Sequence, residues 1–562
     1  MKRFICAAAI AALLPAYAAA QTAQELVDGA KDTGSVVNYG MGYNLNRFST
    51  LDQVNKQTVK NLRPVWAYSL EDLQSQESQP LVYKGTLYVS TEKATMAIDA
   101  KTGRQIWKVT LDYPPEMYRM TCCGNNSRGV ALYDGKVFRA ALDNRVIAYD
   151  AKTGKELWST KAAEVKDGYS MTVAPLAVNG VIIVGNSGAE YGTRGFIDGY
   201  DAQTGKRLWR THTVACPGEP GGESWPAGDA CQHGGGSAWV TGSYDPELDT
   251  VYWGTGNPGS WNPVIRPGDN LYTSSVLALD PKTGKIKWHY QFTPADGFDF
   301  DGVNEMVLAT IPVEGQQRKV IMHANRNGFF YVIDRTNGKL LAAHAFVPQN
   351  WAKEIDLKTG RPVTTELVDR YHKGENVGSS PGAFGGKNWS PMSFNPTTGL
   401  AYVNTHYLPL GMKISAQPWK QGELWFGAEL GPPVMSDLPK DQHPPAALKA
   451  IDPMTGNVKW MVPDKRPRWG GTLATKGGLV FDGELAGEFK AFDADTGQVL
   501  WSFQTGSGVE GQPITWEADG VQYVAVTSGM GGVYWLYGND AELKSTVPQG
   551  GMLWVFALSD KR

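Results

Sequence analysis

Three aspartates lie within six residues of the stretch Gln291–Asn304, whose sequence is QFTPADGFDFDGVN. If Phe298–Asp301 is extended, alternate side chains face opposite ways, so Asp299 and Asp301 point to one side and the two phenylalanines to the other. Neighbouring carboxylates repel each other and raise one pKa unless a cation lies between them. The stretch therefore predicts either a solvated acidic turn or a metal site, in which Asp299 is a catalytic base, Asp301 an extra ligand and Asp296 the next candidate base.

Other motifs upstream favour the metal site over the solvated turn. They are an adjacent Cys-Cys pair, a GAEYG turn and a GTGNPGSWN turn. The segment GNSGAEYG is rich in small residues, which let a backbone approach a ligand closely.

The composition indicates many short strands joined by tight turns. The chain has 562 residues, with 65 Gly, 33 Pro and 19 Trp, and 19% of its residues are charged, which suits neither a helical nor a disordered protein. The net charge of −3 gives no basic field that would attract nucleic acid. No apolar run reaches the roughly 18–20 residues that a membrane span needs.

The first twenty residues have the pattern of a secretory signal peptide. Lys2 and Arg3 precede the apolar run Phe4–Leu14, and small residues follow at Ala16–Ala20. We therefore expect cleavage near residue 20 and a single mature domain over residues 21–562. Because the removed segment holds two basic and no acidic residues, the mature charge becomes −5, and the destination is the periplasm or the cell exterior.

Four cysteines remain in the mature chain, an even number that suggests disulfides in an oxidising compartment. Cys216 and Cys231 flank a Gly/Pro-rich loop, and a bridge between them would restrict that loop in the unfolded chain. We take this pair as structural, although the sequence does not show whether it is bridged. No CxxCH motif occurs, so the chain has no c-type haem of its own.

One pattern, Asp, two residues, Thr-Gly, three residues, Trp, recurs along the chain, and its first three copies are 51 residues apart. Apolar alternating runs precede the turn, Asp caps it and Gly supplies a positive φ, so each copy predicts a hairpin. Around eight such units, with Trp packed between neighbours, predict an all-β, eight-bladed β-propeller. A short helix is expected over Thr50–Lys60. The six complete copies are Asp99–Trp107, Asp150–Trp158, Asp201–Trp209, Asp280–Trp288, Asp452–Trp460 and Asp493–Trp501.

These motifs together resemble the pyrroloquinoline-quinone (PQQ)-dependent alcohol dehydrogenases, periplasmic quinoproteins of the methanol/ethanol dehydrogenase family. The resemblance rests on the DxxTGxxxW repeat, CCGNNSRG, GAEYG, GTGNPGSWN and FDFDG, and it extends to the opening segment Tyr43–Trp66. It covers essentially the whole mature chain. The resemblance implies a propeller with the quinone and a metal near its central axis.

The resemblance assigns roles residue by residue. Cys122 and Cys123 match a vicinal disulfide that stacks on one face of the quinone, and Trp239 matches the indole on the other face. Asp299 matches the catalytic base, which accepts the alcohol proton. The oxygen-bearing metal ligands implied are Glu190, Asn257, Asp299 and Asp301.

The resemblance also implies partners for the three carboxylates and the carbonyl of the quinone. Arg326 matches the arginine beside the quinone carbonyl, and Val533 departs from the pattern because methanol dehydrogenases have Trp there. The other cofactor-binding residues implied are Glu77, Arg128, Thr172, Ser187, Gly188, Ala189, Asn388, Trp389 and Trp469.

The activity implied is oxidation of a primary alcohol to an aldehyde, with a soluble periplasmic cytochrome c as electron acceptor. A homodimer is common in the family. A second Asp two positions after the base, here Asp301, is typical of the lanthanide-dependent relatives, so La³⁺ or Ce³⁺ is expected. A calcium-dependent ethanol-type quinoprotein and a methanol dehydrogenase are the alternatives. The smaller Val533 favours a longer or aromatic alcohol over methanol.

The insert between two repeats, Tyr407–His443, is expected to help roof the pocket. Its large side chains suggest an apolar wall, with ordinary loop packing as the alternative; they are Trp419, Trp425, Phe426 and Met435.

Two rival interpretations come from other classes of protein. A non-catalytic propeller that scaffolds outer-membrane assembly would lack Glu190, Asn257, Asp299 and the Cys pair. A membrane-bound glucose dehydrogenase type would need N-terminal spans.

Overall fold

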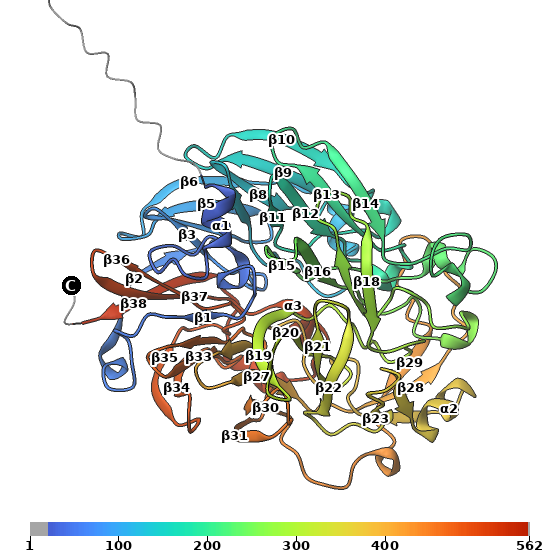
Figure 1. Ribbon diagram of the computed structural model, residues 1–562. Helices are drawn as coiled ribbons and strands as arrows, with labels where there is room; N and C mark the ends of the chain where they lie inside the picture. Colours follow the sequence, from blue (N-terminus) through green and yellow to red (C-terminus); the bar gives the residue numbers. More distant parts are fainter. Residues whose placement is uncertain (1–20, 560–562) are drawn as a thin grey trace, which may run out of the picture.

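The computed structural model describes residues 21–559, and the expected signal peptide lies outside them. Strands dominate the chain, so the all-β prediction is confirmed. In the described residues eight sheets have four or five strands each, which matches the eight blades predicted, and they are arranged in a ring (Figure 1).

Each of the first four blades is built from antiparallel strands that follow one another along the chain. The first four blades are β3 (Leu81–Tyr83), β4 (Thr86–Ser90), β5 (Ala94–Asp99) and β6 (Gln105–Thr110); β7 (Ala131–Tyr133), β8 (Lys136–Ala140), β9 (Arg145–Asp150) and β10 (Glu156–Lys161); β11 (Leu176–Val178), β12 (Val181–Gly185), β13 (Phe196–Asp201) and β14 (Arg207–His212); and β15 (Ser243–Asp245), β16 (Thr250–Gly254), β17 (Ser275–Leu279) and β18 (Ile286–Gln291).

Two of the remaining four blades also include a strand from near the N-terminus. The four are β19 (Val307–Val313), β20 (Gln316–Ala324), β21 (Phe329–Asp334) and β22 (Lys339–Ala345); β26 (Ser393–Asn395), β27 (Leu400–His406), β30 (Ala446–Ile451) and β31 (Val458–Asp464); β32 (Leu473–Thr475), β33 (Leu479–Gly483), β34 (Glu488–Asp493) and β35 (Val499–Gln504) with β1 (Phe48–Ser49); and β36 (Ile514–Ala518), β37 (Val521–Ser528) and β38 (Met552–Leu558) with β2 (Leu62–Ser69).

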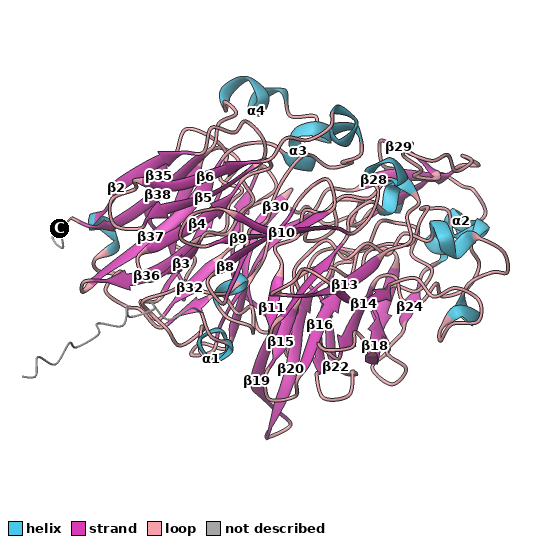
Figure 2. Cartoon of the chain, turned by 90° about the horizontal axis from the view of Figure 1, so that it is seen from above, coloured by secondary structure: helices cyan, strands magenta, loops and turns pink. Residues whose placement is uncertain are grey.

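Two small sheets and four short helices decorate the ring. The helices α3 and α4 lie together on the face opposite α1 (Figure 2). The small sheets pair β23 (Ala352–Ile355) with β24 (Pro362–Thr364), and β25 (Val377–Ser379) with β28 (Leu410–Ile414) and β29 (Ala428–Gly431); the helices are α1 (Ala23–Val27), α2 (Glu366–His372), α3 (Gly532–Tyr537) and α4 (Ala541–Thr546). No helix among residues 21–559 is long and apolar enough to cross a bilayer.

The two ends of the described chain close the ring. Strand β2 pairs antiparallel with β38, with Leu62 opposite Leu558 and Ser69 opposite Met552. This pairing completes the last blade, and the ring leaves only short, protected sheet edges.

The repeated turn interlocks neighbouring blades. Asp150 Oδ1 accepts hydrogen bonds from the backbone and hydroxyl of Thr153 at 2.9 and 2.7 Å, and Gly154 has φ +72°. A Cβ on Gly154 would lie 2.8 Å from the Trp107 ring of the preceding blade, and Trp107 Nε1 donates to the Ala151 carbonyl at 3.0 Å. Trp therefore packs between neighbouring blades, as predicted. The same indole-to-carbonyl bond recurs at Trp158–Ala202, Trp209–Pro281, Trp460–Ala494 and Trp501–Leu62.

The segment that precedes β2 ties together blades that are distant in sequence. Residues 36–47 run past the first strands of several blades and bond to them through the backbone. Because these bonds use main-chain groups, they depend on the path of the segment and not on its side chains. They join Val36 to Val82, Tyr43 to Tyr244, Asn44 to Leu308, Asn46 to Phe394 and Arg47 to Ala474, at 2.8–3.0 Å.

The prediction of a helix over Thr50–Lys60 is wrong, because only the 3₁₀ turn Val59–Asn61 forms there. The Asn55 side chain accepts from the Thr58 amide at 3.1 Å, and the Thr58 hydroxyl donates to the Gln53 carbonyl at 2.7 Å. Asn and Thr side chains that capture nearby backbone groups compete with a helix in this way.

The interlock predicts that Gly154→Ala destabilises the protein more than Gly399→Ala. Both glycines have φ +72°, so both substitutions strain the backbone, but nothing lies within 4 Å of a Cβ at Gly399. The contact with Trp107 should cost a further ~1–3 kcal/mol in the free energy of unfolding. Thermal denaturation of the two variants measures the difference, and equal melting temperatures would show that the indole contact contributes nothing.

Candidate active site

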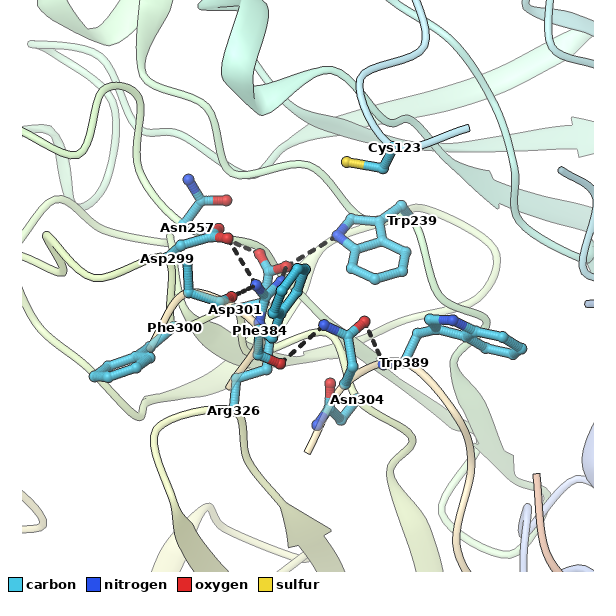
Figure 3. Close-up of polar contacts among 12 residues, drawn as sticks. Cys123, Trp239, Asn257, Asp299, Phe300, Asp301, Asn304, Arg326, Phe384 and Trp389 are labelled. Carbon is cyan, nitrogen blue, oxygen red and sulfur yellow. Dashed lines mark hydrogen bonds and ion pairs between the residues drawn. The ribbon is translucent and has the colours of Figure 1, made fainter. Parts of the chain in front are cut away.

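The acidic stretch is a loop between β18 and β19, and Phe298–Asp301 is not extended within it. Asp299 has φ +63°, and the Asp296 carboxylate accepts the amides of Phe298 at 2.9 Å and Phe300 at 2.7 Å, which curls the loop. Asp299 and Asp301 nevertheless approach the same arginine, while Phe300 points away from them (Figure 3).

Arg326, in the turn after β20, bridges the two carboxylates. Its Nη2 lies 2.7 Å from Asp299 Oδ2 and its Nη1 lies 2.5 Å from Asp301 Oδ2. Burial alone would lower the pKa of Arg326, but Asp299, Asp301 and the nearby Glu190 outweigh burial and raise that pKa. The guanidinium is therefore a permanent positive charge at the centre of the site.

Asp301 is held by donors from three different loops. Its Oδ1 accepts the Asn257 backbone amide at 2.7 Å, and its Oδ2 accepts Trp239 Nε1 at 3.2 Å as well as Arg326. None of these partners belongs to the turn that follows at Gly302, so Asp301 does more than cap its own loop. The Asp301 carboxylate therefore joins the loops that carry Trp239, Asn257 and Arg326.

Asp299 is the more accessible of the two carboxylates. Its side chain is 12% exposed, against 3% for Asp301. Burial raises the pKa of Asp299 well above its ordinary value, and the charges of Asp301, Glu190 and Asp296 add to the rise against the opposing effect of Arg326. An accessible carboxylate with a raised pKa has the properties of a general base.

Asp296 has a structural role in this loop. It is 2% exposed, and its two oxygens accept the backbone amides that shape the loop. Burial raises its pKa to about 6, against the effects of these amides and of Arg266.

Glu190 and Asn257 approach Asp301 from two other loops. The Asn257 amide lies 3.3 Å from Glu190 Oε1 and 3.2 Å from Asp301 Oδ1, and its other side lies 3.1 Å from Trp261 Nε1. With nitrogen toward the carboxylates it donates to both of them. With oxygen toward them, three oxygens converge as they would around a cation.

The charges of this group fit a bound cation. Two buried carboxylates, Asp299 and Asp301, and the half-buried Glu190 face a single guanidinium. Burial and the charge of Asp301 together raise the pKa of Glu190 to about 7. Among the described residues no three His, Cys, Asp and Glu side chains form a metal site by themselves, so a cation here would also use the Asn257 amide and donors from the cofactor.

A second polar group lies beside the first and has the donors that an anionic cofactor needs. Arg128 Nη2 lies 2.7 Å from Glu77 Oε2, and Arg128 Nη1 donates to Thr172 Oγ1 at 2.6 Å. Thr172 Oγ1 lies 3.2 Å from Ser187 Oγ. The turn Gly188–Ala189 follows directly and leads to Glu190. Four of the predicted cofactor residues are therefore in one connected network.

The predicted indoles surround the Arg128 guanidinium. Its carbon lies 4.7 Å from the Trp239 ring centroid and 4.8 Å from that of Trp389. Trp469 stacks on His406 at 5.1 Å and shares an apolar cluster with Trp239 and Trp389. In the described chain Arg128 Nε, Trp389 Nε1 and Trp469 Nε1 are buried donors with no hydrogen-bond partner, which suits a polar ligand between them.

Cys122 and Cys123 form a disulfide, and Cys122 Sγ lies 3.8 Å from Glu190 Oε2. Figure 3 shows Cys123 on the side of the site where the Trp239 indole lies. The predicted pair Cys216 and Cys231 is also bridged.

Asn388 is the predicted residue with the least direct connection to the site. Its side chain bonds within its own loop: Nδ2 donates to the Phe384 carbonyl at 3.0 Å, and Oδ1 accepts the Trp389 backbone amide at 2.9 Å. It therefore shapes the loop that carries Trp389.

Sequence reasoning missed three contributors. Phe384 lies beside Arg326 (Figure 3) and packs against Trp469, and no motif singled it out. Lys387 and Glu305 form a fully buried ion pair of 2.9 Å that ties the acidic loop to the Trp389 loop. The only available signal was the position of Glu305, four residues after Asp301.

The insert Tyr407–His443 packs against the ligand-bearing loops. The Trp425 amide donates to the Glu190 carbonyl at 2.6 Å, and Phe426 lies 4.9 Å from Trp261 between ring centroids. Met435 is 72% exposed, so its expected place in an apolar wall is wrong.

Comparison with known proteins gives one consistent result. The profile described as "PQQ: Glucose/ethanol/alcohol dehydrogenase, beta-propeller domain" matches residues 37–373 and 363–524. The quinoprotein alcohol dehydrogenase PedH of Pseudomonas putida is 41% identical over 583 residues, covering 99% of this chain and 96% of PedH. The lanthanide-dependent methanol dehydrogenase of Methylorubrum extorquens is 36% identical over 595 residues, covering 98% of each chain. The solved structure of a europium-containing methanol dehydrogenase superposes with a TM-score of 0.90 at 37% identity, covering 95% of this chain and 100% of that one.

Proposed function

The chain belongs to the PQQ-dependent glucose/ethanol/alcohol dehydrogenase family, and on that premise we propose that this quinoprotein oxidises primary alcohols to aldehydes with the help of a lanthanide ion. The observation that carries the proposal is the Arg326 guanidinium between Asp299 and Asp301, with Glu190 and Asn257 beside them. This arrangement combines an accessible base with a set of oxygens for a cation.

The residues of the site would have separate roles in proton transfer, cation binding and cofactor binding. When bound, PQQ supplies an electron-accepting ring and the cation polarises it. Asp299 accepts the hydroxyl proton of the alcohol, because it is the accessible carboxylate with the raised pKa. Arg326 fixes the orientation of Asp299 through a charge-assisted bond. Glu190, Asn257 and Asp301 would hold the cation, while Arg128, Thr172 and Ser187 would hold the cofactor carboxylates.

Asp299→Asn should lower kcat at least ~100-fold, since an amide cannot accept the proton. The variant should keep its fold, its bound quinone and its metal, which absorption spectra and elemental analysis would check. Dye-linked alcohol oxidation measures the loss. If the loaded variant retained most of its turnover, the base would lie elsewhere and Asp296 would be the next candidate.

The preference for a lanthanide follows from charge. The site has three negative charges, on Glu190, Asp299 and Asp301, and one positive charge, on Arg326. Bound PQQ would add the negative charges of its own carboxylates. A trivalent ion compensates this total better than a divalent one, and it polarises an oxygen more strongly. The names of two relatives, which specify a lanthanide and europium, support the same choice.

Titration of the metal-free enzyme with PQQ present should give turnover with La³⁺ or Ce³⁺ and little with Ca²⁺. Asp301→Ala and the isosteric Asp301→Asn should both lose the lanthanide-dependent activity, because each removes the third carboxylate charge. Full turnover with calcium alone would contradict the lanthanide assignment. It would leave the alternative of a calcium-dependent ethanol-type enzyme.

The substrate we propose is an alcohol longer than methanol, or an aromatic one. Val533 lies in an apolar cluster with Phe384, Tyr534 and Trp535, where a larger residue would take up more of the space. We expect kcat/KM to be higher for ethanol and benzyl alcohol than for methanol, measured side by side with the loaded enzyme. A preference for methanol would favour the methanol dehydrogenase alternative.

We further propose a periplasmic location and a soluble cytochrome c as electron acceptor. The support is the signal-like N-terminus and the lack of a haem-binding motif in the sequence. Cell fractionation and reduction of a purified soluble cytochrome c in place of the dye test the two statements separately.

A further inference from the structure

A glycine-rich segment, His233–Gly236, lies between the loops that carry Glu190 and Asn257. One of its amides donates at 2.8 Å to the carbonyl of Thr193, three residues after Glu190, and another donates at 2.8 Å to the Asn257 carbonyl. A Cβ on Gly235 would lie 2.7 Å from that same carbonyl, so only glycine fits at this approach. The segment therefore sets the separation of two proposed metal ligands through its backbone.

This segment is fixed at its start by the disulfide outside the cofactor site. Cys231, two residues before His233, is bridged to Cys216 across a Cα–Cα distance of 5.3 Å. Both cysteines belong to a buried cluster with Trp225, and a Cβ on Gly234 would lie 2.7 Å from Trp225 Cη2. The disulfide is therefore connected to the ligand loops by the short, tightly packed segment Cys231–Gly236.

The opposite side of the Glu190 turn is held by Trp419 from the insert. Trp419 Nε1 donates to the Tyr191 carbonyl at 3.0 Å, and a Cβ on Gly192 would lie 2.5 Å from the indole. The indole also packs against the His233 ring, with centroids 3.9 Å apart, and His233 Nδ1 lies 3.2 Å from the Gly192 carbonyl. His233 therefore joins the glycine-rich segment to the indole.

We infer that the Cys216–Cys231 disulfide and the Trp419–His233 stack are positioning elements of the cation site, which set its affinity for the metal and take no part in proton transfer. The inference rests on the proposed function, since it takes Glu190 and Asn257 as metal ligands.

The physical reason is the repulsion between the carboxylates. Glu190 and Asp301 are both close to the Asn257 amide, and without a cation they repel each other. Contacts that prevent the loops from separating preorganise the ligands, so less conformational entropy is lost when the metal binds. Residues that orient metal ligands from outside typically change metal affinity 10–100-fold when they are replaced.

The test uses the full-length protein, freed of metal and supplied with PQQ, in two variants. Trp419→Phe keeps an aromatic ring but removes the bond to the Tyr191 carbonyl, and the double variant C216A/C231A removes the disulfide while leaving Cys122–Cys123 intact. Titration with Tb³⁺, followed by luminescence, gives the dissociation constant. We expect it to rise about 3–10-fold for Trp419→Phe and about 10–100-fold for the double variant. The kcat at saturating La³⁺ should stay within about twofold of wild type.

Met435→Ala is the matched control, because Met435 belongs to the same insert but is exposed. Its dissociation constant should equal that of wild type. Weaker Tb³⁺ binding with unchanged saturated kcat supports the inference, whereas a lower melting temperature with unchanged binding overturns it and leaves an ordinary structural role. If the double variant does not fold, the binding of Trp419→Phe decides alone.

The same titration separates this inference from the proposed function. If wild type binds Tb³⁺ and both variants bind it within twofold, the inference fails and the proposed function stands. If wild type binds no Tb³⁺, the proposed cation site fails and the inference falls with it.

Discussion

The bridge from Arg326 to Asp299 and Asp301 is the interaction on which the rest of the site depends. Three carboxylates gathered in one largely buried site would repel one another strongly, and one guanidinium compensates only part of their charge. Such an arrangement persists only where the surrounding structure prevents the side chains from moving apart. The excess negative charge is also what makes the site able to bind a cation.

A closed ring of sheets supplies that rigidity. The proposed ligands come from loops of different blades: Glu190 follows β12, Asn257 follows β16 and Arg326 follows β20. Most blades are fixed to the next by an indole that bonds to one of its backbone carbonyls. The buried pair of Lys387 and Glu305 adds a direct connection between two of the site loops. Small shifts of one blade are therefore resisted by its neighbours.

How much of this could be read from the sequence differs from feature to feature. The hairpin repeat was predictable because its Asp and Gly each have a local role in the turn that is visible in sequence, and because its Trp recurs at a fixed spacing. The conformation of Phe298–Asp301 was not predictable, because Asp296 captures two amides of its own loop. The helix expected over Thr50–Lys60 is wrong, because Asn55 captures the nearby Thr58 amide. Phe384 and the Lys387–Glu305 pair were missed, since their roles arise from contacts between residues far apart in the chain.

The pairing of β2 with β38 affects the chain while it is being synthesised. Apart from β1, the strands of the other blades lie between β2 and β38 in the sequence, so a ribosome must synthesise them before β2 can find its partner. A chain released early would present β2 and β37 with unpaired backbone groups, the kind of edge to which other strands add. Truncated products should therefore self-associate or be degraded, whereas a circular permutant that moves the chain ends to an exposed turn elsewhere would keep every sheet whole.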